Sequence, residues 1–188
     1  MENKAGTHAR PYPGHGSMWF FVLGDLWIFT CYFACYIYDR AQNPDAFLRG
    51  QELLSTGTGV LNTILLLTSS LLVAACAHAT RAGDFKAASR LLALGGSFGL
   101  GFLVSKAAEW SAKIRAGLPE ATQEFFLYYF MFTGLHVVHV LLGLFILGLL
   151  WRELRDQRRV DFVEAGATYW HMVDALWIVI FALLYLMR

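Results

Sequence analysis

Five long apolar stretches divide the chain, at residues 18–38, 58–80, 91–112, 125–151 and 166–187. Each is close to the roughly 20 residues that a helix needs to cross the hydrocarbon layer of a bilayer. The stretches are continuous, as in "LNTILLLTSSLLVAACAHA", whereas the strands of a membrane barrel alternate apolar and polar residues. The pattern therefore predicts an all-α integral membrane protein with five transmembrane helices.

The segment before the first apolar stretch, residues 1–17, is polar and includes Pro11 and Pro13. Because a cleaved signal is basic and then apolar from its start, we expect an attached polar tail followed by a five-helix transmembrane domain over residues 18–188. Of the 188 residues, 57% are hydrophobic, and the mean hydropathy is +0.48. This composition exceeds what a soluble domain of the same size needs to fill one core.

Basic residues are distributed unevenly between the two predicted sides of the membrane. Nine fall in the tail and in the second and fourth connections: Lys4, Arg10, Arg81, Lys86, Arg90, Arg152, Arg155, Arg158 and Arg159. Five fall on the opposite side: Arg40, Arg49, Lys113, Arg115 and Arg188. Since cytoplasmic loops carry an excess of Lys and Arg, this distribution predicts a cytoplasmic N-terminus and a C-terminus outside.

Charge and motifs exclude several soluble functions. The net charge of +1 does not provide a basic surface for nucleic acid, and the sequence contains no zinc-like spacing, P-loop or dinucleotide fingerprint. The informative residues are therefore polar side chains at membrane depth, where an ionisable group is costly unless it finds a partner.

Such residues occur in four of the apolar stretches, as a single carboxylate and three pairs. They are Asp25, Lys106 with Glu109, His136 with His139, and His171 with Asp174. Residues three apart lie on one face of a helix, so each pair is expected to point in one direction. We predict an ion pair between Lys106 and Glu109 and no metal site in this chain.

A carboxylate one-third of the way along the first helix requires an explanation. We predict that Asp25 faces the interior and is hydrogen-bonded to a histidine of the fourth helix, His139 before His136. At 1.5 Å per residue, His171 lies at a depth comparable with that of Asp25, so these two residues would meet if the first and fifth helices were neighbours.

The paired histidines have two interpretations. A packed polar seam is favoured, because two imidazoles three apart on one helix would crowd the same face of a haem. His171 could supply a ligand from the opposite side, so haem or metal ligation stays open on spacing alone. In the third stretch, Gly95 and Gly99 form a small-x-x-x-small step that predicts close helix packing.

Five segments, in order, resemble subunit III of the haem-copper oxidases from Met18 onward. They are "MWFFVLGDLWIFTCYFACY", "LNTILLLTSS", "AAEW", "FTGLHVVHV" and "YWHMVDALWIVIFALLY". The larger members have two further N-terminal helices. The five-helix form resembles subunit III of bacterial quinol oxidases and the E protein associated with bacterial nitric oxide reductase, and "GLGFLVSKAAEWSAKI" favours the latter.

The resemblance implies an accessory subunit of a respiratory complex in the bacterial inner membrane, with no catalytic residue and no redox centre of its own. Haem, and copper where present, would belong to a catalytic partner subunit, while this chain would bind phospholipid and support assembly, stability or proton supply. Asp25 matches the family's intramembrane carboxylate, and Glu109 matches the acidic residue that closes a helix. The remaining matches are His136 and His139 in the "TG-H-x-x-H" motif and His171 and Asp174 in "WH-x-V-D".

Three alternatives accompany the nitric oxide reductase interpretation. The first is subunit III of a bacterial quinol or cytochrome c terminal oxidase. The second is a stand-alone electron carrier that binds haem through its histidines. The third is an independent proton or ion pathway built around Asp25, Glu109 and Asp174.

Overall fold

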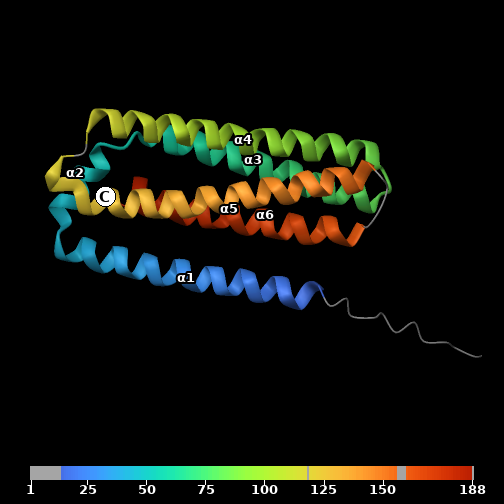
Figure 1. The fold of residues 1–188 in the computed structure, drawn as a ribbon, viewed down its shortest axis with the longest axis horizontal. Coiled ribbons are helices and arrows are strands. Elements are labelled where there is room, and N and C mark those ends of the chain that lie inside the picture. Colours follow the sequence, from blue (N-terminus) through green and yellow to red (C-terminus); the bar gives the residue numbers. More distant parts are fainter. Residues whose placement is uncertain (1–13, 118, 156–159, 188) are drawn as a thin grey trace, which may run out of the picture.

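The computed structural model describes residues 14–117, 119–155 and 160–187, and every element in these ranges is helical (Figure 1). The elements are α1 (Gly14–Gln42), α2 (Pro44–Glu52), α3 (Thr56–Arg81), α4 (Phe85–Ala116), η1 (Glu120–Thr122), α5 (Gln123–Arg155), α6 (Val160–Phe181) and η2 (Ala182–Leu186). The all-α prediction is confirmed for the described residues.

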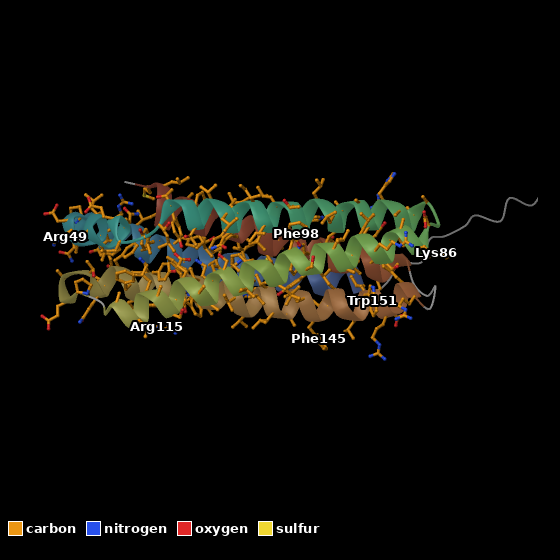
Figure 2. The ribbon with its side chains drawn as sticks, turned by 90° about the horizontal axis from the view of Figure 1, so that it is seen from above. Arg49, Lys86, Phe98, Arg115, Phe145 and Trp151 are labelled. Atoms are coloured by element: carbon orange, nitrogen blue, oxygen red, sulfur yellow. The ribbon has the colours of Figure 1, made fainter. Side chains whose placement is uncertain are left out.

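Four spans in the described part of the chain are long and apolar enough to cross a membrane: Thr56–Arg81, Phe85–Ala116, Glu120–Arg155 and Phe162–Leu186. Figure 2 shows the matching distribution of side chains, with Arg49 and Arg115 near one end, Lys86 near the other, and Phe98 and Phe145 between them. The chain is a multi-pass membrane protein.

The first helix differs from its prediction. α1 begins at Gly14, inside the segment predicted as a polar tail, and residues 1–13 lie outside the described residues. Its side chains are described from Leu23 onward, and that part includes three charged residues, Asp25, Asp39 and Arg40. α1 is not among the four candidate spans found in the described residues, so these residues do not establish a fifth span.

The ends of α3, α4 and α5 and the start of α6 lie beyond the predicted apolar stretches, because polar residues continue and cap the helices. The Ser55 side chain accepts a hydrogen bond from the Thr58 amide at the start of α3, and Asp84 caps α4 in the same way. Gly83, with φ of 79°, makes the turn between α3 and α4. α2 was not predicted, since it is short and mostly polar; its Phe47 is buried.

Helices α3 to α6 form a four-helix bundle, in which α3 packs most extensively against α4 (Figure 1). The predicted packing glycines lie at close contacts. A Cβ on Gly95 would be 3.3 Å from the Ser69 carbonyl oxygen, and one on Gly99 would be 2.9 Å from the Trp170 ring. A Cβ on Gly143 would be 2.7 Å from the same ring. The two glycines on α4 and α5 thus create the space that Trp170 occupies.

α1 lies along the side of this bundle and contacts it through a narrow stripe (Figure 1). Phe29 and Tyr36 are buried on this stripe, whereas Trp27 and Tyr38 are 72% and 66% exposed. Most of the described surface of α1 therefore faces outward, and the helix is attached through aromatic contacts, such as Phe33 with Phe132, as well as through hydrogen bonds.

The C-terminal turn η2 is one such point of attachment. It is a π-helical turn, and carbonyl groups in the last turn of a helix have no partner within the helix. The Leu183 carbonyl accepts hydrogen bonds from the Tyr36 hydroxyl of α1 and the Gln51 amide of α2, each at 3.1 Å. Arg40 donates to the Met187 carbonyl. The turn therefore connects α1, α2 and α6.

Replacing Tyr36 with Phe is expected to lower the free energy of unfolding by about 1 kcal/mol, because it removes one buried hydrogen bond to Leu183. The measurement is unfolding of the detergent-solubilised protein. Tyr38→Phe is the matched control, since Tyr38 lies on the same helix but is exposed. Equal effects of the two substitutions would contradict the role of Tyr36 in attaching η2.

Candidate functional site

The carboxylate of α1 meets a histidine of α5, as predicted. The His139 Nε2 atom lies 3.1 Å from Asp25 Oδ1 and 3.0 Å from Asp25 Oδ2. The two side chains are about four-fifths buried, with exposures of 19% and 21%. Phe29 packs edge-on against the imidazole, with ring centroids 5.6 Å apart. Asp25 thus faces the bundle, and His139, not His136, is its partner.

The second nitrogen of His139 determines how many protons this pair holds. His139 Nδ1 lies 2.7 Å from the Leu135 carbonyl oxygen, and because a carbonyl only accepts, Nδ1 must carry a proton and donate it. The hydrogen bond to Asp25 then contains one further proton, bound either to Nε2 or to the carboxyl group. Both arrangements have no net charge, which suits a site at membrane depth.

A second polar group, the Lys106 cluster, consists of Lys106, Glu109 and Tyr185. Lys106 Nζ donates to Glu109 Oε2 at 2.7 Å and to the Tyr185 hydroxyl at 3.1 Å. Tyr185 in turn donates to Glu109 Oε1 at 2.8 Å. Lys106 is only 1% exposed and Glu109 is 9% exposed. The predicted ion pair is confirmed, and it is closed into a ring by a tyrosine from η2.

A third polar group, the Asp174 cluster, consists of Ser70, His171 and Asp174, between α3 and α6. Ser70 Oγ lies 2.5 Å from His171 Nδ1, and Asp174 lies on the same face of α6, three residues after His171. Asp174 is 4% exposed, and neither of its oxygens has a hydrogen-bond partner within the described residues. Asp25 and His171, which could have met, are bonded to His139 and Ser70 instead.

His136 occupies an apolar setting that spacing alone did not predict. Its side chain is fully buried, and neither ring nitrogen has a hydrogen-bond partner within the described residues. The imidazole lies between Phe102 and Trp177, with centroid separations of 5.5 Å and 5.2 Å. His136 and His139 share a helix but contact different neighbours, so the structure divides the predicted seam into two separate sites.

The donor groups needed for metal ligation are not gathered in the described part of the chain. Within residues 14–117, 119–155 and 160–187, no three His, Cys, Asp or Glu side chains lie close enough to hold one metal ion. The histidines His136, His139 and His171 instead contact aromatic rings, Asp25 and Ser70 respectively.

Sequence reasoning missed the neutral polar partners of these groups. Ser70 and Tyr185 look like ordinary residues of apolar helices, and their roles depend on which helices are neighbours. The same holds for Thr63, whose hydroxyl oxygen accepts from Trp177 Nε1 at 3.1 Å. A helical-face analysis would have placed Ser70 inward together with Thr63, but it could not have named their partners on α6.

Comparison with known proteins identifies the family. The family model of cytochrome c oxidase subunit III matches residues 12–188. Cytochrome c oxidase subunit 3 of Synechocystis is 30% identical, over 97% of this chain and 79% of the relative. The subunit of the same name from Thermostichus vulcanus is 27% identical, over 97% of this chain and 92% of the relative. Quinol oxidase subunit 3 of Bacillus subtilis is 28% identical, over 90% and 84%. The chain belongs to the cytochrome c oxidase subunit III family.

Proposed function

We propose that this chain is an accessory subunit III of a bacterial haem-copper terminal oxidase, located in the cytoplasmic membrane. The observation that carries the proposal is the family match over nearly the whole chain, with relatives named as subunits of cytochrome c and quinol oxidases. The partner is a haem-bearing catalytic membrane subunit, and this chain binds no redox centre itself. The separate positions of its histidines support that division of labour.

The narrower association with nitric oxide reductase, expected from "GLGFLVSKAAEWSAKI", has no support in these comparisons. The relatives described above are oxidase subunits, which favour the alternative that the sequence left open. The nitric oxide reductase association is therefore the second candidate, and the identity of the partner decides between the two.

In this proposal α1 is the fifth membrane span. Its partner residue His139 lies in the middle of α5, a helix apolar enough to cross the bilayer, so α1 runs beside that span at membrane depth. The described chain begins and finishes at opposite ends of the bundle (Figure 1). Together with the distribution of basic residues, this supports a cytoplasmic N-terminus and an outside C-terminus.

The role proposed for the polar sites is to support assembly, durability or proton supply of the catalytic subunit. The Asp25–His139 pair supports this role because it holds one exchangeable proton in a neutral, partly exposed site. Phospholipid is proposed to cover the exposed apolar surface of α1, including Trp27, where no other subunit does.

Affinity purification of the tagged full chain from its native membrane in mild detergent tests the proposal. We expect a haem-bearing catalytic subunit to co-purify, with the absorption bands of an oxygen-reducing oxidase. A nitric oxide reductase in its place would select the second candidate. Recovery of the chain without any haem-bearing partner would contradict both, and haem bound by the isolated chain would contradict the absence of a redox centre.

Replacing Asp25 with Asn is expected to leave the haem content of the complex unchanged and to lower its sustained turnover. The reason is that an amide cannot accept and release the proton that the carboxyl group exchanges with His139. Haem spectra and activity over repeated turnovers are the measurements. Asp45→Asn, on the exposed surface of α2, is the control. Loss of the haem spectrum from an otherwise intact complex would argue against an accessory role.

A further inference from the structure

The centre of the bundle contains one aromatic group that separates two clusters of titratable side chains. Phe102, His136 and Trp177 contact one another, with centroid separations from 4.9 to 5.5 Å. They come from α4, α5 and α6, and all three are fully buried. We call these three residues the aromatic layer.

The two clusters lie on opposite sides of the layer. Asp174 precedes Trp177 by three residues on α6, a rise of about 4.5 Å, toward the end where α3 and α4 are joined. On the other side, Lys106 Nζ lies 4.8 Å from the centre of the Trp177 ring, and its partners Glu109 and Tyr185 lie further toward the α2 end. One indole ring thus separates the Asp174 cluster from the Lys106 cluster.

We propose that the aromatic layer blocks proton movement between the two clusters and that Trp177, held in place by the Phe102 ring packed against it, maintains the block. Each cluster contains groups that can accept and release a proton. Removing the indole ring would leave a cavity between the two clusters, and polar groups would form part of its wall. The block lies within this chain alone and does not depend on an oxidase partner.

The neighbours of Trp177 explain why its removal should open a conducting route. The Trp177 Nε1 atom donates to the Thr63 hydroxyl, and Lys106 lies over the indole ring. Removing the ring would leave both polar groups facing the cavity. A cavity with several polar groups in its wall holds water, and linked water molecules carry protons.

Proton flux into liposomes tests the proposal, with the full chain reconstituted alone, a trapped pH-sensitive dye and an imposed potassium diffusion potential. Liposomes with wild type or Trp177→Phe are expected to show little proton flux, because both proteins retain an aromatic ring at position 177. Trp177→Ala is expected to raise proton flux on the order of tenfold, since an apolar constriction that becomes hydrated starts to conduct. Adding Asp174→Asn to Trp177→Ala should return the flux most of the way to wild type.

Trp170→Ala is the matched control. Trp170 is also fully buried on α6, and its Nε1 donates to the Ser69 hydroxyl at 3.1 Å, but it lies beyond Asp174 and outside the layer. An equal proton flux through Trp170→Ala would overturn the proposal. So would a proton flux through Trp177→Ala that adding Asp174→Asn does not reduce. A folded Trp177→Ala protein as tight as wild type would overturn it too.

Loss of the Trp177 ring could prevent folding, so a second variant addresses the same layer. Phe102→Ala removes the ring on α4 and keeps the hydrogen bond between Trp177 and Thr63. Unfolding in detergent establishes that the variant is folded before reconstitution. Leak from folded Phe102→Ala supports the proposal, and a tight membrane contradicts it.

Discussion

Replacing Glu109 with Gln should lower the free energy of unfolding by about 3–5 kcal/mol, because the substitution leaves the Lys106 ammonium buried without a countercharge. Gln preserves the shape of the side chain and can still bond to Tyr185, so the loss reports the charge itself. Unfolding of the detergent-solubilised protein, monitored by circular dichroism, provides the measurement. Glu120→Gln, in the exposed η1 turn, is the control and should have little effect.

The double variant Lys106→Met/Glu109→Gln distinguishes a lost charge pair from lost packing. Met keeps most of the apolar length of Lys beneath Trp177 while removing the charge that Glu109 neutralises. We expect the double variant to recover most of the stability that Glu109→Gln loses, since a buried ion pair can be replaced by apolar residues at little cost. Additive losses in the two positions would show that the cluster is stabilised by something other than charge compensation.

Replacing Gly143 with Ala is expected to destabilise the bundle by about 1–3 kcal/mol, because the new methyl group overpacks the interface. A Cβ at this position would lie 2.7 Å from two atoms of the Trp170 ring. The Trp170 ring has no room to move away, because its other edge packs closely against the backbone at Gly99, where a Cβ would lie 2.9 Å from the ring. The result to measure is a lower unfolding midpoint in detergent.

Gly148→Ala on the same helix is the control. A Cβ on Gly148 meets nothing within 4 Å, so this substitution should be neutral or stabilising by up to about 1 kcal/mol through helix propensity. If Gly143→Ala were as stable as Gly148→Ala, the close contact between α5 and α6 at Trp170 would be wrong.

The parts of the structure that could be predicted from the sequence are those determined within one helix. Long apolar runs define the helices, and a spacing of three residues defines a face, which was enough for the Lys106–Glu109 ion pair. The contact between Asp25 and His139 was also predicted, but depth along the helices did not select it, since depth placed His171 level with Asp25. Only the ion pair needs no knowledge of which helices are neighbours.

Features that depend on several helices could not be predicted in this way. The position of His136 among aromatic rings requires three neighbouring helices. The attachment of η2 requires α1 and α2 to lie beside the Leu183 carbonyl, for which the apolar sequence Ala182–Leu186 gives no signal. The enzyme that the chain serves is a similar case, because a local motif resembles several branches of a family while the comparison over the full chain favours oxidase subunits.

The attachment of α1 has a consequence for how this protein enters the membrane during synthesis. Asp25 and its partner His139 are 114 residues apart, and Tyr36 and its partner Leu183 are 147 apart. The ribosome therefore delivers the first helix long before either partner exists. In the proposed five-span arrangement, the Asp25 carboxylate must therefore stay in lipid or at the insertion machinery, without its partner, until α5 is made. The first helix is thus made first, but it can form these two contacts only after the later helices are made.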